Sequence, residues 1–143
     1  MKSSALIETI QRHFDSVRDK KIDQIINLYA NSDELFVFVE GPRWQTLGYA
    51  NVARGWRDFV DSEIVVKSCV WVEAPHVKAV GKMGFVAGIT ELQVEVKGET
   101  KAVKMRGTFV LEEEAEGKWK VVHEHFSQPA ADPYGIGDWL KKD

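Results

Sequence analysis

Two histidines near the end of the sequence, His123 and His125, are the side chains best suited to chemistry. They are two residues apart in a run rich in β-forming residues, so in an extended strand both point to one face of a sheet. Trp119, Val121 and Ser127 have the same parity, and we expect them on that face. An imidazole there could transfer protons near neutral pH, hydrogen-bond a ligand, or pack on Trp119 and bond the backbone. All three interpretations stay open.

Metal binding is a fourth interpretation of this pair, because neutral imidazole is a common zinc or iron ligand. A metal site needs a third ligand, and no aspartate or glutamate stands at a suitable place on the same strand face. His76 qualifies only if the fold brings it close to the pair. We therefore expect no metal.

Arg106 is the third polar candidate and lies in another run with strand-like alternation. Its parity matches that of Lys104 and Thr108, which favours an exposed polar row. An arginine buried in a strand would instead face a carboxylate or a ligand. The parity alone therefore favours exposure of Arg106 to solvent over a place in a pocket.

Three aromatic residues near the third predicted helix are further candidates to line a pocket: Trp44, Tyr49 and Trp56. Trp56 stands at helical spacing, which is typical of a core residue. Trp44 follows Gly41-Pro42-Arg43 in a loop, where a large ring often covers a pocket or a partner surface. Simple packing is the competing interpretation for both tryptophans.

The composition is that of an ordinary globular domain and argues against several classes of protein. The 143 residues are 44% hydrophobic and 29% charged. A net charge of -3 argues against nucleic-acid binding. The single cysteine, Cys69, excludes an intramolecular disulfide. No apolar run approaches the roughly 20 residues of a membrane helix, and the charged N-terminal stretch does not fit a secretory signal. We expect one cytoplasmic domain over residues 1–143 that binds neither nucleic acid nor membrane.

Hydrophobic periodicity divides the chain into a helical part and a β-rich part. Spacings of three and four predict helices over residues 4–18, 21–30 and 48–62. Alternation and β-forming composition predict strands over residues 35–39, 64–72, 76–80, 83–96, 101–112 and 119–127. The tail over residues 130–143 is expected either to dock on the body or to fray.

The predicted strand over residues 83–96 changes its apolar parity midway. Odd-numbered positions from Phe85 to Ile89 are apolar, whereas the even-numbered positions from Leu92 to Val96 are apolar. A shift of one residue turns every side chain to the other face of a sheet. We therefore predict a β-bulge or a bend near residues 90–91.

Apolar side chains occupy both faces of the later strands. Val122 and Phe126 have the opposite parity to Val121 and His125. A sheet that is buried on one face alternates more cleanly than this. We therefore expect the second face to contact another copy of the chain in a homodimer.

Helices segregated from an antiparallel sheet define the α+β class. A strongly bent sheet with three helices on its concave side encloses a cone. The space between helices and sheet is then the natural place for a ligand pocket.

This order of elements, together with one motif, resembles a known family. The segment Gly117-Lys-Trp-Lys-Val-Val-His-Glu-His-Phe-Ser-Gln-Pro129 is similar to the end of the calcium/calmodulin-dependent kinase II association domain and its bacterial stand-alone relatives. Arg106 stands where that branch has an arginine, and His76-Val77 resembles its middle segment. Over about residues 5–129 the chain thus resembles the SnoaL-like branch of the nuclear transport factor 2-like, or cystatin-like, superfamily. The resemblance implies that Arg106 and the two histidines face into the cone.

Ketosteroid isomerases share this fold, and the resemblance can be tested against their catalytic residues. They use a tyrosine on the first helix, an aspartate at the end of the first strand and an aspartate on a late strand. The matching positions here are His13, Phe38 and Arg106, so the resemblance does not carry this activity over.

Two classes of function follow from these observations. The first is a small-molecule-binding protein whose ligand is anionic or carbonyl-bearing; as an enzyme it would be a cofactor-free isomerase, cyclase or dehydratase, with His125 as the best catalytic candidate. The predicted ligand-binding residues are Trp44, Tyr49, Trp56, Arg106, His123 and His125. The second class is a non-catalytic association or ligand-sensing module that acts through oligomerisation. We expect no cofactor in either class.

Overall fold

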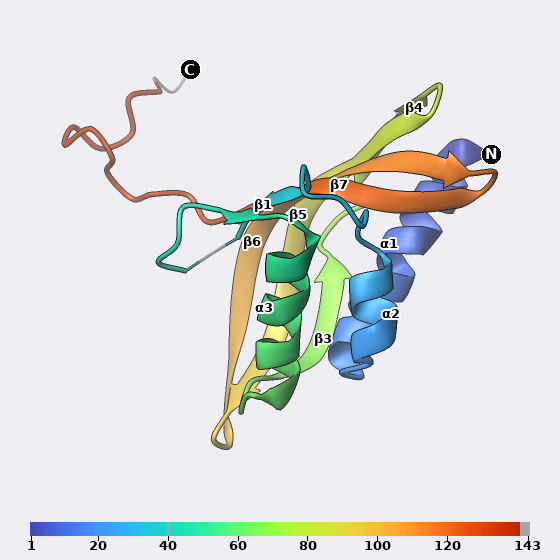
Figure 1. Cartoon of the computed structure of the whole chain (residues 1–143). Helices are drawn as coiled ribbons and strands as arrows, with labels where there is room; N and C mark the ends of the chain where they lie inside the picture. Colours follow the sequence, from blue (N-terminus) through green and yellow to red (C-terminus); the bar gives the residue numbers. More distant parts are fainter. Residues whose placement is uncertain (40, 141–143) are drawn as a thin grey trace.

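A computed structural model describes residues 1–39 and 41–140 and confirms the α+β class (Figure 1). The helices and strands follow one another as α1 (Lys2–Arg18), α2 (Ile22–Asn27), β1 (Phe36–Phe38), β2 (Thr46–Leu47), α3 (Tyr49–Asp61), β3 (Val65–Trp71), β4 (His76–Val80), β5 (Met83–Val96), β6 (Glu99–Ala115) and β7 (Lys118–Ser127). The three helices occupy the predicted segments within a few residues, except that α2 ends earlier. The two-residue strand β2 was not predicted.

The strands form one strongly curled sheet with the order β2-β1-β7-β6-β5-β3, and β4 also pairs with β5. The first half of β5 pairs with β4, and its second half pairs with β3. This change of neighbour along one strand accompanies the curl that is visible in Figure 1. All the pairings among the described strands are antiparallel except β1 with β7, which is parallel.

The hydrophobic core lies between the helices and the concave face of the sheet, here called the inner face. Helix α1 contributes Leu6, Ile10 and Phe14, whose four-residue spacing places them on one side of the helix. The opposing strands contribute buried residues such as Phe109 and Leu111. None of the described helices is both long enough and apolar enough to cross a lipid bilayer.

No bulge occurs near residues 90–91, because β5 pairs with β6 in an unbroken register from Met83 to Val96. The predicted alternative, a bend, fits the change of neighbour from β4 to β3 between Ala87 and Thr90. The parity change has another cause. Val86 and Thr90 lie on the inner face and are buried, whereas Phe85 and Ile89 point to the opposite, outer face and are partly exposed. The apparent change of parity therefore arises because apolar residues occupy the outer face in the first half of the strand and the inner face in the second half.

A bulge does occur in β7, where it was not predicted. The register places Leu111 opposite Val121 and Val110 opposite His123, so Val122 is an extra residue in the strand. Trp119 and Val121 point inward before the bulge, and Glu124 and Phe126 point inward after it. The predicted shared face of Trp119, Val121, His123, His125 and Ser127 is therefore wrong: the last three lie on the outer face.

The C-terminal arm, residues 129–140, does not dock on the body of its own chain. Every residue of the arm is exposed, and the arm extends away from the end of β7 (Figure 1). The last part of the predicted tail, residues 141–143, lies outside the described residues.

Candidate functional site

The inner face carries a buried carboxyl group at Glu124, which is only 3% exposed. The bulge at Val122 sets this side chain inward, beside Phe109 on β6 and Val37 on β1. Tyr29, which follows α2, donates a hydrogen bond from Oη to Glu124 Oε1 at 2.5 Å. A carboxyl group held in a fixed position is one of the groups that can act as a general acid or base.

Trp56 extends this hydrogen-bonded chain toward the surface. Its Nε1 donates to Tyr29 Oη at 3.1 Å, so the phenol oxygen links the indole to the carboxyl group. Trp56 is half-buried and belongs to α3, in which only Val52 and Ala53 are fully buried. The half-buried indole of Trp56 therefore connects α3 to the pair formed by Tyr29 and Glu124.

His13 lies beside the same group of residues, inside the cone. Its ring meets Tyr29, Trp56 and Phe109 edge-on, with ring centroids 5.8, 5.6 and 5.9 Å away. Burial among these rings lowers the pKa of His13 to about 3, so the imidazole is neutral at physiological pH. Its Nδ1 is buried and has no hydrogen-bond partner among the described residues.

A second buried polar atom without a partner among the described residues is Trp71 Nε1. Trp71 packs against Phe14, the neighbour of His13 on α1, with ring centroids 5.3 Å apart. Thr90, the cross-strand partner of Trp71, has its own hydrogen bond to Met105 O. Buried polar groups without partners are uncommon in folded proteins, because each costs free energy. Both atoms therefore mark the interior as a place where a ligand could supply hydrogen bonds.

Of the six residues predicted to bind ligand, only Trp56 is part of this inner cluster. Tyr49 is half-buried against the core. Trp44 is 94% exposed. His123 stacks on Phe36 with centroids 4.2 Å apart, and its Nδ1 lies 3.0 Å from Phe36 O. His123 thus packs on a ring and contacts a backbone carbonyl, as in its structural interpretation, but the ring is that of Phe36 and not that of Trp119.

Arg106 and His125 do lie on one face, as predicted, but it is the outer face. Arg106 is opposite Ser127 in the register, and the next outward pair on these two strands is Thr108 with His125. The guanidinium is exposed and donates from Nε to Ser127 Oγ at 3.2 Å and from Nη2 to Gln128 O at 3.3 Å. These bonds use two of its five N–H groups.

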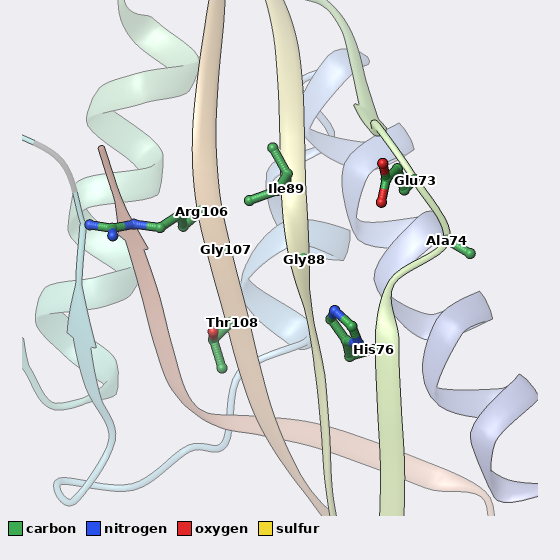
Figure 2. Close-up of a pocket in the computed structure, with 8 residues that line it drawn as sticks. All are labelled: Glu73, Ala74, His76, Gly88, Ile89, Arg106, Gly107 and Thr108. Carbon is green, nitrogen blue, oxygen red and sulfur yellow. The ribbon is translucent and has the colours of Figure 1, made fainter. Parts of the chain in front are cut away.

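A shallow hollow of about 270 Å³ lies on this outer face, over Gly88 and Gly107. Figure 2 shows Arg106 on the β7 side of the hollow and His76 with Glu73 on the opposite side. The hollow is separate from the cluster around Glu124, because the sheet lies between them. The two faces of the sheet therefore offer two different chemistries.

The described residues bring no cluster of metal ligands together, and the thiol of Cys69 is largely buried. Within residues 1–39 and 41–140 there is no group of three or more histidine, cysteine, aspartate or glutamate side chains that could hold a metal ion. Burial raises the pKa of the Cys69 thiol to about 12, which makes it a poor nucleophile.

Sequence reasoning did not assign Glu124 or Tyr29 to a site, and it considered His13 for proton transfer only after His125 and His123. A signal for Glu124 was present: Trp119 and Val121 share one parity, whereas Phe126 has the other. One extra residue between Val121 and Phe126 would turn all three side chains to the same face, so the pattern does not require a second buried face. Tyr29 and His13 had no such signal, because their helical spacing is that of core residues.

Comparison with known proteins identifies the family. The family model described as a SnoaL-like domain matches residues 6–131. The chain belongs to the SnoaL-like family. No curated protein matches the sequence.

Solved structures show the same nuclear transport factor 2-like fold. A protein of unknown function from Pseudomonas putida KT2440 has a TM-score of 0.76 and 23% identity, over 99% of this chain and 96% of its own. A ketosteroid isomerase-like protein from Erwinia carotovora atroseptica has a TM-score of 0.74 and 15% identity, over 90% and 97%. A Xanthomonas campestris protein named after the calcium/calmodulin-dependent protein kinase II association domain has a TM-score of 0.70 and 17% identity, over 84% of this chain and 82% of its own. At identities this low, the structural similarity establishes the fold, and any activity has to be argued from the residues of the site.

Proposed function

We propose that this SnoaL-like protein binds a small carbonyl-bearing molecule in its cone and that Glu124 transfers a proton to or from it. The observation that carries the proposal is the buried Glu124 carboxyl group bonded to Tyr29 Oη. A carboxylate in such a place can take a proton from the carbon next to a carbonyl and return it to another carbon. This is isomerisation without a cofactor, one of the reactions expected from the sequence.

The chemistry of the interior favours a carbonyl over an anion as the ligand group. His13 is neutral there, and a second acidic group would have to share the space with Glu124. The partnerless Nδ1 of His13 and Nε1 of Trp71 are polar atoms that a ligand carbonyl or hydroxyl could satisfy. The anionic alternative fits the outer face better, where Arg106 is exposed.

A thermal-shift measurement with cyclohexanone as the probe tests the proposal. Ligand at about 100 times its Kd stabilises the folded state by about 2.7 kcal/mol, which is a readily measured rise in Tm. We expect cyclohexanone to stabilise the wild type and His125→Gln, and to lose this effect in Glu124→Gln. His125→Gln is the matched control, since it lies one residue away on the opposite face.

The catalytic part is tested by hydrogen–deuterium exchange at the carbons next to the carbonyl of cyclohexanone in D₂O, followed by NMR. Wild type should exceed Glu124→Gln by about 10²-fold or more, the usual contribution of a positioned general base. Equal stabilisation and equal exchange in the two proteins would remove Glu124 from the site. Loss of both effects in His125→Gln instead would move the site to the outer face.

The second candidate function is a non-catalytic association or ligand-sensing module. The observation that favours it is the apolar outer face, on which Phe36, Phe85 and Ile89 are more than one-third exposed. Sedimentation at micromolar concentration tests it, since association through this face predicts at least twice the chain mass. A monomer at all concentrations would remove this candidate.

A further inference from the structure

The C-terminal arm exposes large apolar side chains in a short stretch. Tyr134, Ile136, Trp139 and Leu140 are 73, 70, 64 and 68% exposed. Single exposed apolar residues are ordinary, but four within seven residues make a patch of the kind that marks an interaction surface. The arm that carries these side chains projects from the body beyond the end of β7 (Figure 1).

Local hydrogen bonds give the arm a defined shape. Asp132 Oδ1 accepts a bond from the Gly137 amide at 2.8 Å, and Asp138 Oδ1 accepts one from the Leu140 amide at 2.9 Å. Gly135 and Gly137 take positive φ angles of 77° and 70°, which glycine adopts without strain. These turns lower the entropy that the arm would lose on binding.

The root of the arm is fixed at the edge of the outer-face hollow. Gln128 Nε2 donates to Lys104 O at 3.0 Å, and Arg106 Nη2 donates to Gln128 O at 3.3 Å. The arm therefore leaves the sheet beside Arg106, yet its apolar side chains remain exposed on their own chain. They need a surface that another molecule provides.

The outer face of the same sheet is complementary to the arm. The register aligns Phe38, His125, Thr108, Ala87 and His76 in one row across β1, β7, β6, β5 and β4. The neighbouring row aligns Phe36, His123, Val110, Phe85 and Lys78. These rows offer aromatic and aliphatic contacts next to the exposed guanidinium of Arg106.

Charge supports the same pairing. The arm carries two carboxylates, Asp132 and Asp138, and its sequence has no lysine or arginine. On the outer face, Arg106 lies on the β7 side of the hollow, across it from Glu73, and Lys78 lies in the neighbouring row. An arginine that keeps unused N–H groups is a good partner for a carboxylate.

We propose that the arm of one chain binds the outer face of a second copy, with its aromatic side chains on the aromatic and aliphatic residues of these two rows and a carboxylate near Arg106. In a dimer with two-fold symmetry, each chain places its arm on the outer face of the other chain, so both outer faces and both arms are covered. It does not depend on the chemistry proposed for the inner face.

Disulfide cross-linking between two different variants tests this contact. Ile136→Cys and Thr108→Cys are purified separately, mixed and oxidised with oxidised glutathione, so a bond between positions 136 and 108 can form only between chains. The native Cys69 gives little background, because burial raises its pKa to about 12. Ile136→Cys mixed with Glu116→Cys, at the remote β6–β7 turn, is the control pair.

We expect the first pair to give at least tenfold more mixed dimer than the control pair. Sedimentation of full-length Trp139→Ala should also show association weakened by about tenfold or more. Cross-linking no better than the control overturns the proposal. So does a wild type that stays monomeric, or a dimer unaffected by Trp139→Ala, which would indicate contact between sheets without the arms. Trp139 touches no core residue, so this variant does not put folding at risk.

Discussion

At the scale of single residues, the inner cluster keeps polar groups where burial penalises them. Glu124 and His13 are 3% and 5% exposed, and His13 gives up its charge to remain there. Replacement of such groups by apolar residues often raises stability, so a protein that retains them gains something other than stability. This residue-level cost is the reason to assign the cluster a functional role.

The lowered pKa of His13 predicts an acid-sensitive stability. The group has a pKa of about 3 when folded and 6.5 when unfolded, so between these values the unfolded chain binds more protons. Its contribution is fully present above about pH 6.5 and is lost as the pH falls toward 3. From pH 7.5 to 5.0 this amounts to about 2 kcal/mol.

Urea unfolding at these two pH values measures the effect. The wild type should lose about 2 kcal/mol more than His13→Phe, whereas His76→Gln, an exposed control, should behave as the wild type. An equal loss in wild type and His13→Phe would mean that His13 titrates normally in the folded protein.

At the scale of elements, one extra residue decides which chemistry each face receives. Most helices and strands followed from periodicity, because spacings of 3.6 and 2 report directly on burial. The bulge at Val122 did not, since a bulge depends on pairing with β6, which a single strand's sequence does not record. Because the bulge was not predicted, His125 was expected inside the cone and Glu124 outside it, the reverse of their positions in the structure.

Close packing of α1 and β4 against β5 gives a further element-level prediction. A Cβ on Gly84 would lie 2.6 Å from Leu6 Cδ1 and 3.0 Å from Lys78 O, and the second contact is with backbone. Gly84→Ala should therefore destabilise the protein by about 1–3 kcal/mol. Gly55→Ala, within α3, meets nothing within 4 Å and should stabilise it by about 0.5–1 kcal/mol.

Denaturant unfolding of both glycine variants checks this pair. Opposite signs support the close approach of α1 and β4 to β5. A Gly84→Ala protein as stable as the wild type would mean that α1 sits farther from the sheet than the structure has it.

At the scale of the whole molecule, one curled sheet separates two surfaces. The inner face holds an acid, a phenol and a neutral imidazole among aromatic rings, and the outer face holds exposed aromatic and aliphatic side chains beside an arginine. The resemblance seen in the sequence led to the correct fold and family. It could not assign residues to faces, because members of one fold differ in the details that set side-chain direction.

The five tryptophans allow the central claim, ligand binding beside Glu124, to be tested in one measurement. Their indole N–H signals are recorded by ¹H–¹⁵N NMR while cyclohexanone is added. Trp56 and Trp71 have Nε1 atoms inside the cone, whereas Trp44 and Trp139 are exposed at 94% and 64%. We predict saturable shifts of the Trp56 and Trp71 signals, absent in Glu124→Gln, with Trp44 and Trp139 unchanged. Shifts confined to Trp44 and Trp139, or the same Trp56 shifts in Glu124→Gln, would contradict the account.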